Sequence, residues 1–125
     1  MDLTPSTAQG QNMIEAYGDG GFRVSGQTYR GSILVTPDHV VDWPVETMDN
    51  VSSQSLELLF GQPHSPEILL LGCGPVMALV PLELRAGVKA RGASLEPMDT
   101  GAACRTYNVL LLEGRSVAAA LIAID

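Results

Sequence analysis

EILLLGCGPVM, residues 67–77, is an apolar run that breaks into Gly-Cys-Gly-Pro. The run is typical of a buried strand, and the glycines after it allow either a nucleotide-binding loop or a tight turn. A dinucleotide-binding loop needs glycine at three points, of which Gly72 and Gly74 supply two while Met77 occupies the third. A P-loop would continue with Gly-Lys-Ser/Thr, and a loop for S-adenosylmethionine usually has an acid where Leu70 stands. These residues favour a strand that ends in a sharp turn.

Around this run, the second half of the chain alternates apolar segments with helical ones. Strands that are apolar on both faces and separated by helices are typical of a parallel sheet covered by helices. Neither 67–72 nor 116–124 contains a charged residue after Glu67, so both strands are expected inside the sheet. The pattern predicts a βαβαβ unit with strands at 67–72, 93–98 and 116–124 and a first helix at 81–92.

The segment from 100 to 114 has two interpretations. TYNVLLLEGRSV, residues 106–117, could be a hairpin that turns at Glu113-Gly114. We expect a helix from Thr100 to Glu113 instead, because Thr100 can cap its start and Gly114 can supply its left-handed end. The apolar residues of that helix would share one face: Ala103, Tyr107, Leu110 and Leu111.

The first half of the chain has a different sequence pattern. Between 13 and 43, short strand-like runs alternate with turns rich in Gly, Asp and Pro, which predicts an antiparallel meander. Residues 51–62 are expected to form a helix that ends at Gly61. The apolar face of this helix would consist of Leu56, Leu59 and Phe60.

Length and composition limit the class of protein. The chain has 125 residues, 46% of them hydrophobic, which fits one α/β domain over 12–125 after a flexible tail of 1–11. Its net charge of −7 disfavours nucleic acid and anionic membranes as partners, because both attract basic surfaces. The first residues lack the basic and apolar regions of a signal peptide, so a cytoplasmic location is expected. Two cysteines and two histidines are too few for a recognisable zinc site, and the thiols of Cys73 and Cys104 are expected to be free.

Ligands of parallel sheets usually bind at the carboxyl ends of the strands, next to helix N-termini. One such end is Gly72-Cys73-Gly74, and the other is Asp99-Thr100, where the next helix begins. If the two strands are neighbours, Arg105 adds a positive charge that could hold a carboxylate or phosphate. Alternatively, Arg105 pairs with Glu96 or Asp99 and the turn is merely tight. The residues of this candidate anion-binding cleft are Gly72, Cys73, Gly74, Thr100, Gly101 and Arg105.

A catalytic centre is not identifiable from the sequence. His39 and His64 fall in expected loops without an evident partner, and Cys104 lies beside alanines in the expected helix, as a small core residue would. Neither paired carboxylates nor a Ser-His-Asp arrangement can be placed. We therefore lean against an enzyme and expect no cofactor and no metal.

Three segments resemble a known family: GGFRVSGQTYRGSILVTPDHVVDW, EILLLGCG and MDTGAACRTYNVLLLEGRSVAAALI. The family consists of small uncharacterised domains and includes a human mitochondrial respiratory complex I assembly factor and an adipogenesis-associated protein. The resemblance covers residues 13–124 and implies a three-layer α/β fold, with helices on one face of a mixed sheet and a β-hairpin layer on the other. It also implies signature positions without an assigned role: Gly72, Gly74, Thr100, Ala103, Thr106, Tyr107, Asn108, Glu113 and Arg115.

Two hypotheses for function follow. The first is a non-enzymatic protein-interaction module similar to an assembly factor, which the resemblance and the missing catalytic group favour. The second is a protein or enzyme that binds a small anion or metabolite at residues 72–74 and 99–105. An unknown protein partner is expected under the first hypothesis, and the chain itself is expected to be a monomer or a weak homodimer.

Overall fold

The computed structural model describes residues 10–61 and 65–125. Most of the expected tail, residues 1–9, lies outside the described residues. In chain order the elements are β1 (Ile14–Gly18), β2 (Gly21–Val24), β3 (Gln27–Arg30), β4 (Ile33–Val35), β5 (Val40–Asp42), the 3-10 helices η1 (Met48–Asn50) and η2 (Gln54–Leu59), β6 (Ile68–Gly72), α1 (Leu82–Ala90), β7 (Ser94–Met98), α2 (Thr100–Leu112) and β8 (Val117–Leu121).

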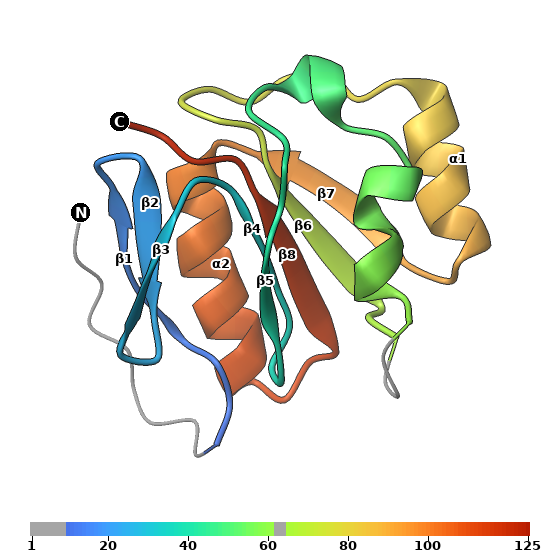
Figure 1. Cartoon of the computed structure of the whole chain (residues 1–125). Helices are drawn as coiled ribbons and strands as arrows, with labels where there is room; N and C mark the ends of the chain where they lie inside the picture. The colour runs from blue at the N-terminus through green and yellow to red at the C-terminus, as the bar shows by residue number, and fades with distance from the viewer. Residues whose placement is uncertain (1–9, 62–64) are drawn as a thin grey trace.

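A five-stranded mixed sheet forms the centre of the molecule, in the order β5-β4-β8-β6-β7 (Figure 1). β6 pairs in parallel with β7 on one side and with β8 on the other, while β4 pairs antiparallel with β8 and β5. β6, β7 and β8, with α1 and α2 between them, form the expected βαβαβ unit. β6 and β8 are interior strands, which confirms the prediction made from their apolar, uncharged sequences.

The side chains of the interior strands alternate between two hydrophobic cores. On one face of the sheet, Leu69 and Leu71 of β6 pack with Leu84 and Val88 of α1. On the other face, Leu70 packs with the apolar side of α2 and with the three-stranded sheet of β1, β2 and β3. The two helices therefore lie on opposite faces of the central sheet (Figure 1).

This arrangement confirms the α/β class with a mixed sheet and corrects one detail of the layers. The resemblance places both helices on one face, whereas α2 and the β1–β3 sheet share a face and α1 covers the other. The physical reason is the strand order. The chain moves one way along the sheet from β6 to β7 and the opposite way from β7 to β8, so two right-handed crossovers put their helices on opposite faces.

The expected antiparallel meander is confirmed and is divided between two sheets. β1, β2 and β3 pair antiparallel in the order β1-β2-β3, while β4 and β5 join the central sheet. Asp19 and Gly20 join β1 to β2 with φ of 53° and 78°, and Ser25 and Gly26 join β2 to β3 with φ of 47° and 85°. Positive φ at both positions is the geometry that lets a two-residue turn follow the strand twist.

Residues 100–112 form a helix, so the helix interpretation of this segment is confirmed over the hairpin. Gly114 follows the helix with φ of 79°, as predicted. The expected cap is wrong, because Asp99 stands at the cap position and its carboxylate accepts a hydrogen bond from the Ala102 N–H at 2.9 Å. Thr100 is instead the first helical residue, and its side chain is fully buried.

The helix expected at 51–62 is shorter in the structure and is not an α-helix. Its described part contains only the short 3-10 helix η2, although Leu56, Leu59 and Phe60 are buried as expected, and residue 62 lies outside the described residues. Ser52 and Ser55 bond to each other's backbone groups at 2.7–3.1 Å. These reciprocal bonds have the pattern of a capping box and fix the start of the helical turn near Ser52.

Candidate functional site

The carboxyl ends of β6 and β7 lie side by side, because the strands are parallel neighbours with Gly72 opposite Met98. Thr100 ties these ends to the end of β8. Its hydroxyl donates a hydrogen bond to the carbonyl of Ile122 at 2.7 Å and accepts one from the Gly74 N–H at 2.9 Å. The Thr100 N–H donates to the Gly74 carbonyl at 2.8 Å. The structure thus brings Gly72, Gly74 and Thr100 together.

Gly72 and Gly74 serve the backbone geometry of this turn. A Cβ on Gly72 would lie 3.0 Å from Thr100 Oγ1 and 3.1 Å from Leu121 Cδ2, so a side chain would press on both elements. Gly74 has φ of 109°, a conformation that residues with side chains rarely adopt. The two glycines let α2 begin close against the ends of β6 and β8.

Three of the backbone donors at this turn are engaged in internal hydrogen bonds. The Gly74 N–H donates to the Thr100 hydroxyl, and the Thr100 N–H donates to the Gly74 carbonyl. The Ala102 N–H donates to the Asp99 carboxylate, which already supplies the negative charge that a helix N-terminus attracts. A ligand anion would have to displace these partners.

Arg105 also has a partner within the chain. Its Nη1 donates to the hydroxyl of Tyr17 at 2.8 Å, a phenol from β1 in place of the carboxylates considered above. The same hydroxyl covers Gly101, since a Cβ there would lie 2.7 Å from it. These contacts weigh against an anion-binding cleft at 72–74 and 99–105, which stays a prediction.

Cys73 and Cys104 are both free and buried. Cys73 belongs to the core beneath α1 and Cys104 to the core between α2 and the β1–β3 sheet, so the central sheet separates them. Burial raises the pKa of the Cys104 thiol from 9.0 to about 12, and the nearby charge of Arg105 offsets only part of this effect. A thiol with so high a pKa is a poor nucleophile at neutral pH, which suits a core residue.

Two signature positions implied by the resemblance anchor the N-terminal strand. The Tyr107 hydroxyl donates to the carbonyl of Asn12 at 3.1 Å. The Asn108 side chain forms hydrogen bonds with both backbone groups of Ile14, at 2.8 and 3.0 Å. Both residues have a structural role, because they hold β1 against α2.

Other signature positions lie at the surface. Glu113 and Arg115 are exposed and Thr106 is half-buried. Thr106 and Arg115 line a hollow of about 480 Å³ along α2 and β7, together with Met98 and Leu110. The packing of the core does not require the charged groups of Glu113 and Arg115.

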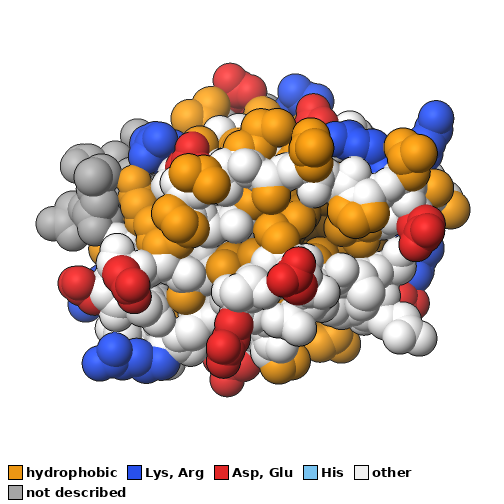
Figure 2. All heavy atoms as spheres, turned by 90° about the horizontal axis from the view of Figure 1, so that it is seen from above, with side chains coloured by type: hydrophobic (Ala, Val, Ile, Leu, Met, Phe, Trp, Pro, Cys, Tyr) orange, Lys and Arg blue, Asp and Glu red, His pale blue; other side chains and the backbone are white. Residues whose placement is uncertain are grey.

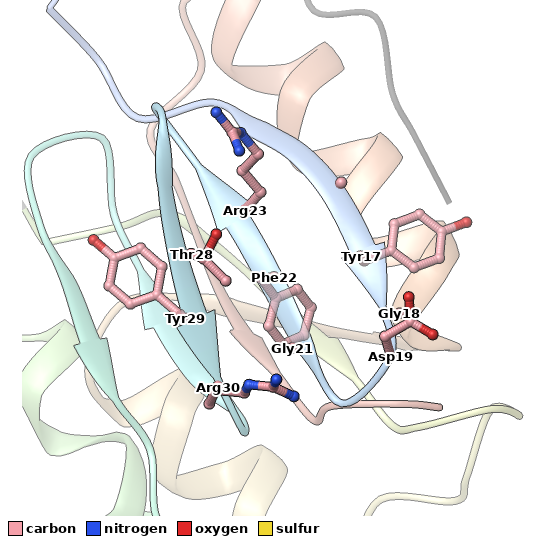
Figure 3. Close-up of a pocket in the computed structure, with 10 residues that line it drawn as sticks. Tyr17, Gly18, Asp19, Gly21, Phe22, Arg23, Thr28, Tyr29 and Arg30 are labelled. Carbon is pink, nitrogen blue, oxygen red and sulfur yellow. The ribbon is translucent and has the colours of Figure 1, made fainter.

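A second hollow, of about 260 Å³, lies on the β1–β3 sheet (Figure 3). Gly18 and Gly21, which line it, face each other across β1 and β2 and contribute no side chains. Arg23 and Arg30 border it, and Arg23 forms a 3.2 Å ion pair with Glu15. Both guanidinium groups belong to exposed residues, so water screens their attraction for an anion.

An apolar surface lies on the connection between β6 and α1. The segment PVMALVPL, residues 75–82, contains no charged or polar side chain, and we call it the apolar loop. Val76, Met77, Leu79 and Leu82 are exposed by 70%, 59%, 90% and 83%. Figure 2 shows hydrophobic side chains gathered over this face of the molecule.

Sequence reasoning missed the apolar loop because it assigns apolar residues to the core by default. The available signal was a long uncharged run, interrupted by two prolines, that fits neither a strand nor a helix. Monomeric proteins rarely expose contiguous apolar patches of large side chains unless a partner covers them. No helix within 10–61 and 65–125 has the length and apolar character needed to cross a bilayer.

Comparison with known proteins shows that the chain has relatives in bacteria and in vertebrates. The chain is 39% identical over 109 residues to an uncharacterised protein of Rhodobacter capsulatus, covering 87% of this chain and 82% of that protein. It is 35% identical over 122 residues to the NADH dehydrogenase [ubiquinone] 1 alpha subcomplex assembly factor 3 of Danio rerio, covering 98% of this chain and 70% of that protein. The human protein of the same name is 31% identical, and the chain spans 59% of its length.

Solved structures show the same fold. A crystal structure of a Bordetella parapertussis protein matches with a TM-score of 0.84 and 36% identity, covering 94% of this chain and 99% of that chain. A solution structure of a Bordetella pertussis protein, described as a Mth938-like domain, matches with a TM-score of 0.82 and 32% identity, covering 98% of this chain and 92% of that chain. The family model described as "Protein of unknown function (DUF498/DUF598)" matches residues 14–122, and the chain therefore belongs to this family.

Proposed function

We propose that the chain is a non-enzymatic protein-interaction module, similar in action to the assembly factors among its relatives, and that the apolar loop is its contact surface. The name of the Danio rerio relative supports an assembly role. The observation that carries the proposal is the exposure of four large apolar side chains on one continuous segment. The cytoplasmic location and the monomeric or weakly dimeric state expected above are part of the same proposal.

The energetics favour a partner that covers this surface. Full burial of a Val, Leu or Met side chain stabilises a complex by roughly 1.5–3 kcal/mol. Burial of the four exposed side chains of the apolar loop by a partner would add several such contributions to the binding free energy. These side chains are Val76, Met77, Leu79 and Leu82. A protein partner fits better than an anionic membrane, because a chain with a net charge of −7 is repelled by anionic lipid.

The proposal is tested by exchange of domains in a relative of stated function. Zebrafish cells that lack the Danio rerio assembly factor would receive that factor with this chain in place of its matching part. Assembled NADH dehydrogenase is then measured on native gels with an activity stain. We expect the chimera to restore assembly, and we expect a Met77→Ser/Leu79→Ser variant to lose that effect.

A matched control separates the apolar loop from surface hydrophobicity in general. Val109 and Leu112 of α2 are exposed by 53% and 42%, so a Val109→Ser/Leu112→Ser chimera makes the same chemical change elsewhere. We expect this control to restore assembly like the unmodified chimera. A chimera that restores nothing, or a loop variant that restores as much as the control, would contradict the proposal.

A further inference from the structure

A groove lies between α1 and the edge strand β7, with a volume of about 760 Å³. Figure 1 shows α1 beside β7, the last strand on that side of the central sheet. Ala93 and Leu95 belong to its lining while their side chains are buried in the core, and the exposed Leu82 joins the groove to the apolar loop. The groove and the apolar loop thus form one continuous surface.

The helix segment beside the groove carries a charge opposite to that of the rest of the chain, and one acid, Glu67, also lines the groove. Residues 82–91 contain three basic residues and one acid, a local charge of +2, which leaves −9 on the other residues. Arg91 is occupied by an ion pair with Glu57 at 2.7 Å. Arg85 and Lys89 line the groove, and Lys89 has no ion-pair partner among residues 10–61 and 65–125. A partner with acidic side chains would complement this surface.

The backbone of β7 is poorly suited to receive an added strand. Ser94 donates to the Glu67 carbonyl and Met98 accepts from the Cys73 N–H, so alternate residues of β7 face β6. Leu95 and Pro97, which alternate with Ser94, Glu96 and Met98, turn their backbone groups to the open edge.

Neither Leu95 nor Pro97 offers a full set of free backbone groups to an added strand. Arg85 Nη1 donates to the Leu95 carbonyl at 3.1 Å, and Pro97 has no N–H to offer. Strand addition relies on a row of free donors and acceptors along an edge. A partner in this groove must therefore bind through its side chains, as an amphipathic helix does.

We propose that the groove between α1 and β7 binds an amphipathic helix of a partner protein. The apolar face of that helix rests on the exposed side chains of Leu82 and Ala86, and acidic residues on its flank lie opposite Arg85 and Lys89. The proposal rests on the proposed function and names the class of partner segment. Leu82, Ala86 and Lys89 recur at spacings of four and three residues, so they present one side of α1 to such a helix.

Two other occupants fit less well. A second copy of this chain in a symmetric dimer would place one basic groove against the other, which costs energy through like-charge repulsion. An anionic membrane would attract Lys89, but the net charge of −9 on the rest of the chain opposes its approach.

The test uses the full chain in its own cells, with the photoreactive amino acid p-benzoylphenylalanine at position 86 as the probe. Illumination should cross-link a partner segment whose sequence has apolar residues at helical spacing and Asp or Glu on the flank. Lys89→Glu should lower the cross-link yield about tenfold, because attraction becomes repulsion. Arg30→Glu makes the same charge change on the β1–β3 sheet, outside the groove, and should leave the yield unchanged. Replacing the facing acid of the partner by lysine should restore the yield with Lys89→Glu.

Each contrary result overturns the proposal. These results are a lipid adduct, a cross-link to a second copy, a basic or extended partner segment, no adduct at position 86, or equal losses from Lys89→Glu and Arg30→Glu. The proposed function fails separately, since it is judged by the Met77→Ser/Leu79→Ser chimera. A loop variant that abolishes assembly while Lys89→Glu leaves the cross-link unchanged would reject the helix groove and keep the interaction module.

Discussion

Asn108 of α2 pairs with Ile14 of β1 through both ends of its side-chain amide. Nδ2 donates to the Ile14 carbonyl at 2.8 Å, and Oδ1 accepts from the Ile14 N–H at 3.0 Å. The pairing of β1 with β2 is irregular between Ile14 and Ala16. Asn108 thus takes the place of a neighbouring strand and satisfies two backbone groups of a fully buried residue.

Replacing Asn108 with Ala should lower the free energy of unfolding by about 2 kcal/mol or more, since two buried backbone groups lose their partners. Urea unfolding measures this loss, and amide hydrogen exchange should show weakened protection of Ile14. Val109→Ala, at the next and exposed position, should change stability by less than about 0.5 kcal/mol. Equal stabilities of the two variants would show that β1 is held by apolar packing alone.

The parts of the fold that depend on long apolar patterns could be predicted from the sequence. The uncharged runs of β6 and β8 identified interior strands, and the residues sharing a face of α2 identified a helix over a hairpin. The side of the sheet that each helix covers could not be read from these patterns. It depends on the order of β8, β6 and β7 across the sheet, which is a property of long-range pairing.

Local competition explains the errors in single elements. Asp99 and Thr100 are both good cap residues, and only the packing shows that the Thr100 hydroxyl is used by Gly74 and Ile122 instead. Ser52 and Ser55 bond to each other's backbone groups at the start of η2, and the expected helix is shorter in the structure. The apolar loop was missed because hydrophobicity predicts burial only on average.

The different roles of Asp99 and Thr100 lead to different losses of stability. Asp99→Ala removes a helix cap and should cost about 1 kcal/mol. Thr100→Val keeps the shape but leaves the Gly74 N–H and the Ile122 carbonyl without their buried partner, so it should cost about 2 kcal/mol. Denaturant unfolding of both variants measures the difference. A larger loss for Asp99→Ala than for Thr100→Val would contradict the structural assignment of the cap.

The raised pKa of Cys104 predicts a loss of stability at high pH. Above pH 9.0 the unfolded chain releases the thiol proton, while the folded chain keeps it until about pH 12. The unfolded state then binds fewer protons, so the free energy of unfolding should fall by about 1.4 kcal/mol for each pH unit in this window. Burial also raises the pKa of Tyr107, which adds to the fall above its ordinary pKa.

Urea unfolding between pH 8 and pH 10.5 measures this slope in the wild type and in Cys104→Ala. The variant should be less stable at neutral pH, because it leaves a small cavity, but its stability should fall less steeply above pH 9. Identical slopes for the two proteins would mean that the Cys104 thiol ionises as readily in the folded chain as in the unfolded one.

The internal hydrogen bonds at 72–74 and 99–105 predict the response to small anions. The Gly74 and Thr100 N–H groups donate within the turn, and Arg105 donates to Tyr17. A phosphate ion would have to break these bonds while it also lost its own hydration. In a titration with inorganic phosphate, we expect the amide signals of Gly74, Thr100 and Gly101 to stay in place at millimolar concentrations.

Exposed basic groups provide the internal comparison in the same spectra. Arg23 and Arg30 border the open hollow on the β1–β3 sheet, so nearby amides should drift weakly and without saturation as phosphate is added. A common, saturating shift of Gly74, Thr100 and Gly101 that disappears in Arg105→Ala would establish the anion-binding cleft instead. In that case the hydrogen bonds of Thr100 and Arg105 would break on binding. The result would then support a metabolite-binding protein as an alternative to the interaction module.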